Sequence, residues 1–321
     1  MRLLAVLLLL LPVVAGAQPA AKVPRLCVLS FDPEAHVPIR FQPFFQGLRD
    51  LGYVDGKNIA IDIRAANGDG ERFPALAAQC VANRADVIVV TTTPAAQAAK
   101  KATTTIPIVM HPLGDPVGTG LVKSLARPGG NVTGLTFMAT GMAAKRLSLL
   151  KEALPRLTKV LVLSYLVDPI APPQVAEMRK AAEILGIKLL VQEVRTAEDI
   201  AAGFEAGKKE GAEAVIVTWE SIFFVNRPQL IDLAAKHRLP SMFPGLVFVE
   251  NGALLSYGSD STILNPRTAI YVDRILKGAK PADLPVEQPT TFIFAVNLKT
   301  ARTLGVTIPQ TILLRADRII E

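Results

Sequence analysis

The sequence contains few of the residues that usually mark enzyme and metal sites. Its 321 residues include only three histidines, two cysteines and one tryptophan. His36, His111 and His237 have no partner at metal-ligand spacing, so we expect them in loops or on the surface and predict no metal site. The chain also lacks a G-x-S-x-G nucleophile motif and a P-loop. These absences disfavour an enzyme and predict that no cofactor is bound.

Clusters of positive charge are also missing. The net charge is +7, from 35 lysines and arginines against 28 acidic residues, but the longest basic runs are pairs such as Lys100-Lys101. A nucleic-acid groove would need clustered basic residues with aromatic residues between them. We therefore expect no nucleic-acid partner and interpret the positive charge as a solvated surface.

One long apolar run is present, and it lies at the N-terminus. Arg2 precedes the apolar residues 3–14, and the small residues Ala15-Gly16-Ala17 then form a site that a signal peptidase accepts. The run is too short to span a bilayer. We predict that residues 1–17 are a cleaved signal peptide, that the mature chain begins at Gln18, and that it is periplasmic.

The two cysteines allow at most one disulfide in an oxidising compartment. Cys27 lies within the apolar run 26–29, and Cys80 falls on the apolar face of a helical pattern. We expect both to be buried free thiols that behave as small hydrophobic side chains, with a disulfide between them as the alternative.

Short β-branched or leucine-rich runs alternate with longer stretches of helical spacing along the chain. This alternation predicts parallel sheets with helices on both faces. The pattern starts near residue 25 and again near residue 159, which indicates two similar halves of about 150 residues each. The expected strands are 25–30, 59–64, 86–90, 106–110, 132–137, 159–163, 187–192, 214–218 and 239–243.

The last third of the chain is less regular. It contains an expected strand at 253–257, a helix at 266–276, a proline-rich connector at 281–289 and a strand at 290–296, followed by a helical stretch. These elements extend neither half simply, which suggests that the chain crosses between the halves more than once.

Ligands of open parallel sheets bind beyond the C-terminal strand ends, where helix N-termini point N–H groups at anions. Thr93-Pro94 and Asp115-Pro116 each combine a helix cap with proline at the first helical position, so they are either ordinary caps or ligand sites. Trp219, at a strand end before Glu220, is either a lid on the core or part of a site. The candidate ligand-binding residues are Ser30, Phe31, Asp32, Thr92, Thr93, Pro94, Ala95, Gly114, Asp115, Tyr165, Trp219, Glu220, Phe223, Tyr257 and Asp260.

A zwitterionic ligand would divide these candidates into roles. A carboxylate requires a helix N-terminus and hydroxyl groups, which Thr92, Thr93 and Ala95 supply. An ammonium group requires a buried carboxylate, for which we expect Asp260 first and Glu220 second. The expected apolar walls around the ligand are Phe31, Trp219 and Phe223.

Eight short segments spread over the chain carry a recognisable pattern. They are FFQGLRDLGY at 44–53, TPAAQAAK at 93–100, IPIV at 106–109, GDPVG at 114–118, LARPGGNVTG at 125–134, GALLSYG at 252–258, ILKG at 275–278 and NLKTA at 297–301. Together they resemble the bacterial ABC-transporter substrate-binding proteins of the tryptophan/tyrosine type, over essentially the whole mature chain.

The resemblance implies a type I periplasmic-binding-protein fold, in which two doubly wound α/β lobes joined by three hinge crossings close on a ligand between them. By the same resemblance, residues 18–137 and 252–284 form one lobe, and residues 138–251 and 285–321 form the other. It also implies a monomeric extracytoplasmic receptor that delivers a small solute to the permease and ATPase subunits of an ABC importer.

Relatives with a known ligand bind an aromatic amino acid, with its carboxylate at the position of residues 93–95 and further contacts at the positions of Asp115 and Asp260. They carry an Asp-Asn-Thr stretch where this chain has Trp219-Glu220-Ser221. The solute is therefore expected to be an amino acid, for which the resemblance favours an aromatic one, or another small carboxylate.

Two other functions stay open at this stage. A ligand-sensing module would be encoded beside a kinase or chemoreceptor instead of a permease. A secreted enzyme on the same fold would turn over the ligand that it binds.

Overall fold

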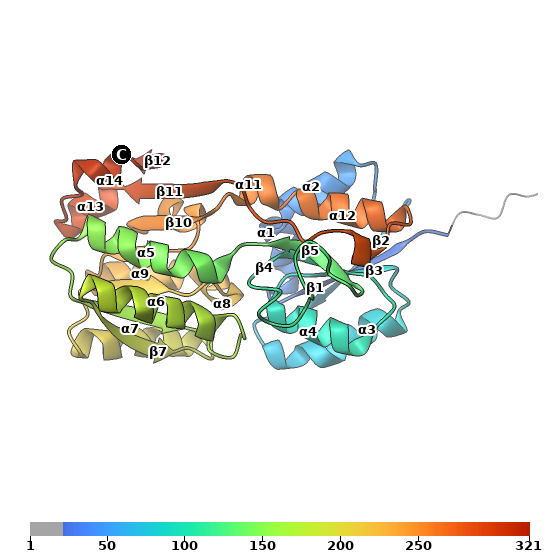
Figure 1. The fold of residues 1–321 in the computed structure, drawn as a ribbon, viewed down its shortest axis with the longest axis horizontal. Coiled ribbons are helices and arrows are strands. Elements are labelled where there is room, and N and C mark those ends of the chain that lie inside the picture. The colour runs from blue at the N-terminus through green and yellow to red at the C-terminus, as the bar shows by residue number, and fades with distance from the viewer. Residues whose placement is uncertain (1–21) are drawn as a thin grey trace, which may run out of the picture.

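The structure is a computed structural model that describes residues 22–321, so the predicted signal peptide at 1–17 lies outside the described residues. Two β-sheets with helices on their faces form two lobes, which lie side by side along the longest axis (Figure 1). The expected fold class, two doubly wound α/β lobes of the type I periplasmic-binding kind, is confirmed. The expected strands are present, with ends that shift by at most three residues.

The first lobe contains a parallel sheet in the order β2-β1-β3-β4-β5. Helices α3 (Phe73–Ala82) and α4 (Thr93–Ala102) cover one face, and α2 (Gln42–Asp50) and α12 (Arg267–Leu276) cover the other. Because both faces are covered, every residue of β3 is buried. The strands are β1 (Arg25–Ser30), β2 (Ala60–Ala65), β3 (Val87–Val90), β4 (Ile108–Leu113) and β5 (Val132–Thr136).

The second lobe contains a sheet in the order β12-β11-β10-β9-β8-β6-β7, parallel except where β10 meets β11. One face packs on α5, α6, α13 and α14, and the other packs on α7 to α10. The strands are β6 (Lys159–Ser164), β7 (Lys188–Glu193), β8 (Ala214–Val217), β9 (Ser241–Phe243), β10 (Leu255–Ser259), β11 (Phe292–Asn297) and β12 (Arg318–Ile320). The helices are α5 (Ala139–Ala153), α6 (Ala171–Leu185), α7 (Ala197–Lys209), α8 (Ser221–Val225), α9 (Arg227–Lys236), α10 (Leu246–Glu250), α13 (Leu298–Leu304) and α14 (Gln310–Leu313).

The chain passes between the lobes at three points: after β5, after β10 and before β11. The prediction that residues 252–284 belong to the first lobe is wrong for its beginning, because β10 pairs with β9 and β11 in the second sheet. The return to the first lobe starts only at α11 (Ser261–Leu264) and α12. The chain then stays there longer than expected, since the Glu287 amide donates to Gly134 O at 2.9 Å.

The prediction of two free thiols is also wrong. Cys27 on β1 and Cys80 on α3 form a disulfide, with their Cα atoms 5.8 Å apart. Because α3 packs directly on β1, both side chains enter the same core within bonding distance.

A third difference concerns His111, which was expected in a loop or on the surface. It is buried in β4, with its Nδ1 atom 2.9 Å from Thr268 Oγ1.

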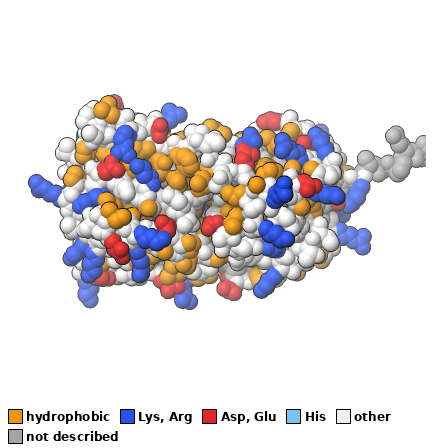
Figure 2. Space-filling view, viewed as in Figure 1, with side chains coloured by type: hydrophobic (Ala, Val, Ile, Leu, Met, Phe, Trp, Pro, Cys, Tyr) orange, Lys and Arg blue, Asp and Glu red, His pale blue; other side chains and the backbone are white. Residues whose placement is uncertain are grey.

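The described surface agrees with the scattered charge of the sequence. Figure 2 shows lysine and arginine side chains spread over both lobes on the face drawn, without one dense cluster. None of the helices within residues 22–321 is long and apolar enough to cross a membrane. The same residues hold no group of three histidine, cysteine or acidic side chains that could bind a metal ion.

Candidate functional site

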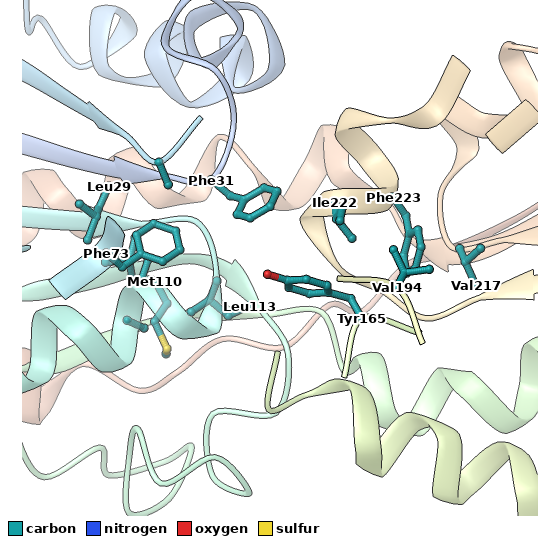
Figure 3. Close-up of a cluster of buried hydrophobic side chains, with 14 of the residues drawn as sticks. Leu29, Phe31, Phe73, Met110, Leu113, Tyr165, Val194, Val217, Ile222 and Phe223 are labelled. Atoms are coloured by element: carbon teal, nitrogen blue, oxygen red, sulfur yellow. The ribbon is translucent and has the colours of Figure 1, made fainter. Parts of the chain in front are cut away.

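The loops that follow the strands of the two sheets meet between the lobes. We call the residues of these loops that lie between the lobes, among them Phe31, Tyr165 and Trp219, the interlobe face. The Phe31 and Tyr165 rings point toward one another across it, with centroids 6.2 Å apart (Figure 3). At the first crossing, the rings of Phe137 and Trp219 lie 4.5 Å apart. Phe31, Tyr165 and Trp219 are each buried, so the two lobes shield one another from solvent along this face.

In the first lobe, the N-terminus of α4 opens onto this face. Thr92 caps the helix, because its Oγ1 accepts a hydrogen bond from the Ala95 amide at 3.3 Å. Thr93 is 1% exposed, and its Oγ1 has no hydrogen-bond partner among the described residues. A helix N-terminus carries partial positive charge and free N–H groups. This end of α4 can therefore accept a carboxylate, with the Thr93 hydroxyl as an additional donor.

The first-lobe acid Asp32 already has a cationic partner. Asp32 is 1% exposed, and its Oδ1 lies 2.6 Å from Nη1 of Arg40. Its Oδ2 accepts a hydrogen bond from Ser30 Oγ at 3.2 Å, and Thr91 Oγ1 in turn donates to Ser30. Since its charge is compensated within the lobe, Asp32 is a poor partner for a ligand cation.

The second lobe presents two buried acids, Asp168 and Glu220, that pair directly with no cationic side chain in the described part of the chain. Glu220 accepts hydrogen bonds from Gln174 Nε2 at 2.8 Å and from Thr218 Oγ1. Burial and the nearby charge of Asp168 raise the pKa of Glu220 well above its ordinary value. Burial also raises the pKa of Asp168 to about 7, although its Oδ1 accepts the Ile170 amide at 3.1 Å. A ligand ammonium group here would favour the ionised form of either acid.

A buried arginine is linked to this acidic pair through a glutamine side chain. Arg146 on α5 is fully buried, and its Nη2 donates to Gln174 Oε1 at 3.3 Å. Its Cζ lies 5.6 Å from the ring centroid of Trp219. Burial lowers the pKa of Arg146 to about 10. Gln174 therefore links Arg146 to Glu220 through the two ends of one amide.

Sequence reasoning missed three members of this network: Arg146, Gln174 and Asp168. Arg146 follows Ala143 on the apolar face of α5, where a charged residue signals a buried partner. Asp168 lies in the loop after β6, which the strand rule already marked. Nothing in the local pattern distinguishes Gln174 from an exposed helix residue.

For four of the expected site residues, the structure shows contacts within their own lobe. Phe223 is fully buried in the core of the second lobe, near Val194 and Val217 (Figure 3). Its neighbour Phe224 faces the first lobe instead, as described below. The other three are Tyr257, Asp115 and Asp260. Tyr257 stacks on Phe292, Asp115 accepts a hydrogen bond from the Gly118 amide, and Asp260 caps α11.

The remaining expected residues are brought together by the loops after β1, β3, β4, β6 and β8. They are Ser30, Phe31, Asp32, Thr92, Thr93, Pro94, Ala95, Gly114, Tyr165, Trp219 and Glu220. Pro94 and Ala95 contribute backbone at the start of α4, and Gly114 lies against the second lobe. The face thus combines a helix N-terminus with a buried hydroxyl in one lobe with buried acids in the other.

Comparisons with known proteins agree with this geometry. A family model described as ABC transporter substrate binding protein matches residues 39–320. A tyrosine-binding protein from Clostridioides difficile strain R20291 is 29% identical over 263 residues, which are 81% of this chain and 75% of that protein.

Solved structures show the same similarity. A conserved domain protein from Vibrio cholerae has a TM-score of 0.86 at 30% identity, covering 93% of this chain and 100% of that one. An ABC domain from Streptococcus pneumoniae in complex with L-Trp has a TM-score of 0.84 at 30% identity, with the same coverage. A ligand-free, open substrate-binding protein from Clostridium difficile has a TM-score of 0.64 at 25% identity, covering 93% and 99%.

Proposed function

Because the chain belongs to the ABC transporter substrate-binding protein family, we propose that it binds an amino acid between its lobes and delivers it to the permease and ATPase of an ABC importer. The family and the relatives described above are binding proteins, which confirms the prediction that the chain is not an enzyme. The amino acid, the closure of the lobes and the importer subunits are the parts that we propose.

The observation that carries the proposal is the buried N-terminus of α4. Thr93 is 1% exposed, and its hydroxyl has no hydrogen-bond partner in the part of the chain that the structure describes. Leaving such a group unpaired costs about 1–3 kcal/mol. A ligand carboxylate would accept from this hydroxyl and from the Thr93 amide, since Pro94 has no N–H and the Ala95 amide already donates to Thr92 Oγ1. It would also complement the helix dipole.

The ligand's ammonium group is assigned to the second lobe. Asp260 was the first choice from the sequence, but its Oδ1 is occupied as the cap of α11, by the amide and hydroxyl of Thr262. We therefore assign the ammonium to Glu220, with Asp168 beside it. Both acids are buried, and neither pairs directly with a cationic side chain within residues 22–321. Phe31, Tyr165 and Trp219 are aromatic neighbours that suit an aromatic side chain.

Closure of the lobes on the ligand is supported by the two structural comparisons. The chain matches the L-Trp complex with a TM-score of 0.84, whereas it matches the ligand-free, open relative with a TM-score of 0.64. The contacts of Phe31 with Tyr165 and of Phe137 with Trp219 fit a closed arrangement.

The direct test is a thermal-unfolding screen of residues 18–321, purified and freed of copurified ligand by partial unfolding and refolding. Ligand at a hundred times its Kd should raise the free energy of unfolding by about 2.7 kcal/mol. We expect L-tryptophan or L-tyrosine to raise the melting temperature, and tryptamine and indole-3-propionate, which lack the carboxylate and the ammonium group respectively, to have much less effect. Failure of every amino acid and small carboxylate to shift the stripped protein would refute the receptor function.

Location outside the cytoplasm is a further part of the proposal. It is supported by the family and by the N-terminal apolar run with its Ala15-Gly16-Ala17 ending. N-terminal sequencing of the expressed protein should start at Gln18 in a soluble osmotic-shock fraction. Retention of Met1 on a membrane-bound protein would contradict it.

A further inference from the structure

Arg40 connects the two lobes at a point outside the proposed ligand contacts. It is the last residue of α1 (Val37–Arg40) in the first lobe. Its Cζ lies 5.2 Å from the ring centroid of Phe41 and 5.1 Å from that of Phe224, which belongs to α8 in the second lobe. One guanidinium group thus contacts an aromatic ring from each lobe.

The first lobe holds this guanidinium in place. Arg40 Nη1 lies 2.6 Å from the buried Oδ1 of Asp32. Ser30 Oγ holds the other carboxylate oxygen at 3.2 Å. Phe41 is fixed in turn by an edge contact with His111, at a centroid distance of 4.9 Å. All of these partners belong to the first lobe, so the cation does not depend on the second lobe for its position.

Contacts within the second lobe also hold the Phe224 ring in place. Its ring centroid lies 5.6 Å from that of Trp219 and 5.0 Å from that of Phe248. The Arg227 Nη1 donates to the Phe224 carbonyl at 3.2 Å. Contact between the lobes thus places a second guanidinium near Arg40, and burial and the Arg40 charge both lower the pKa of Arg227. The Asp32 carboxylate offsets this repulsion.

We propose that Arg40 and Phe224 form an interlobe latch, a cation–π contact anchored by Asp32 that stabilises the closed arrangement and slows ligand release. The inference rests on the proposed function, since it assigns these residues a role in lobe closure. A cation over an aromatic face is a non-covalent contact that can form and break with each closing event. Removing either partner should lower the closed-to-open ratio by about two- to thirtyfold, the range from exposed to desolvated pairs.

The test measures the distance between the lobes directly. Spin labels on cysteines substituted at the exposed residues Lys57 and Ile184 report one lobe each, while the native disulfide stays intact. Double electron–electron resonance then measures the distance between the two labels, with and without L-tryptophan. The proteins compared are the parent, Arg40→Gln, Phe224→Leu and the double variant. We expect each single variant to lose closed population, and the double variant to lose no more than the larger single effect.

Matched controls come from the same lobes. Arg64→Gln removes an ion pair of 2.8 Å with Asp62 inside the first lobe, and Phe292→Leu removes a ring that stacks on Tyr257 inside the second. Both should keep the parent distances. Distance distributions of Arg40→Gln and Phe224→Leu that superimpose on the parent, or a double variant that shows the sum of the two losses, would overturn the latch.

The two proposals fail in different ways. If the parent protein binds no amino acid, the proposed function fails, while the labelled ligand-free proteins still decide the latch. If the parent binds an amino acid and the variants keep both its distances and its dissociation rate, the latch fails and the receptor function stands. A faster dissociation rate with an unchanged association rate is the kinetic result that the latch requires.

Discussion

Gly114 of the first lobe lies directly against Ile170 of the second, so closely that a Cβ atom at Gly114 would be 2.6 Å from Ile170 Cγ2. The glycine thus allows the backbone of one lobe to contact the other. Gly114→Ala should force the lobes apart, because overpacking costs about 1–3 kcal/mol. We expect ligand affinity, measured by calorimetry, to fall by about five- to hundredfold with little change in the stability of either lobe.

Two variants identify the clash as the cause. Gly141→Ala is the matched control, since apart from the neighbouring backbone of its own helix no described atom lies within 4 Å of the added Cβ there. Ile170→Ala should restore much of the affinity to Gly114→Ala, because it removes the colliding methyl groups. Full affinity in Gly114→Ala alone would show that Ile170 moves aside at no cost.

Two adjacent threonines at the start of α4 should respond in opposite ways. Thr93→Val removes a buried hydroxyl that has no hydrogen-bond partner among residues 22–321, so the free energy of unfolding should stay equal or rise. Affinity for an amino acid should fall by about ten- to hundredfold, the value of a hydrogen bond to a charged group. Calorimetry and urea unfolding measure the two effects. Unchanged affinity would remove Thr93 from the carboxylate site.

Thr92→Ala provides the comparison. Thr92 Oγ1 accepts the Ala95 amide, so this variant should lose about 1 kcal/mol of unfolding free energy, as helix caps usually do. Its affinity should fall less than that of Thr93→Val. Equal effects of the two substitutions on both quantities would mean that the helix start acts only as a structural unit.

Most of the fold could be predicted because strand and helix periodicities are local. The β-branched and leucine runs predicted the main strands of both lobes to within three residues. The lobe assignment of β10 could not be predicted in this way, because it depends on antiparallel pairing with β11, from which α11 and α12 of the first lobe separate it in the sequence. The terminal strand β12 was expected as helix, and it is a strand because it pairs with β11.

The site was predictable only where the strand rule marks a loop. Residues 30–32, 92–95, 165 and 219–220 follow strands, and the structure places them between the lobes. Phe223 was selected instead of Phe224 because a one-residue step on a short helix changes the direction of the side chain by about 100°. The disulfide was missed because the contact between α3 and β1 joins residues that are 53 positions apart.

The disulfide should stabilise the first lobe without affecting the ligand. Closing a loop of about 50 residues removes roughly 4 kcal/mol of chain entropy from the unfolded state. Cys27→Ala with Cys80→Ala should therefore lower the free energy of unfolding by up to that amount. Affinity should change less than twofold, because Cys27 and Cys80 belong to the core beneath the sheet and not to the interlobe face.

Urea unfolding with and without dithiothreitol separates the bond from the cavities that the substitutions leave. The reductant should lower the unfolding free energy of the parent and leave the double variant unchanged. Because both cysteines are at most 1% exposed, reduction should require unfolding of the first lobe. If dithiothreitol does not change the unfolding free energy of the parent protein under unfolding conditions, the prediction is wrong.

Asp168 should make the stability of the protein depend on pH in an unusual direction. Burial raises the pKa of its carboxyl from 3.8 to about 7, so the folded state holds a proton that the unfolded state releases. Below about pH 4 this carboxyl therefore does not lower the free energy of unfolding. As the pH rises it lowers that free energy increasingly, and the effect levels off above about pH 7. Asp168→Asn should remove up to about 4 kcal/mol of this penalty between pH 4 and pH 8.

The measurement is the difference in unfolding free energy between Asp168→Asn and the parent protein across this pH range, so that the titration of other groups cancels. Glu213 gives a control of opposite sign, because hydrogen bonds from the Thr158 and Lys159 amides lower the pKa of its carboxyl. Glu213→Gln should cost the most stability at neutral pH and progressively less as the pH falls through the acidic range. A bound ligand ammonium group would favour the ionised Asp168 and should flatten the Asp168→Asn difference when L-tryptophan is present. If the difference stays flat without ligand, Asp168 is ionised in the folded protein, which would contradict the raised pKa that burial gives its carboxyl.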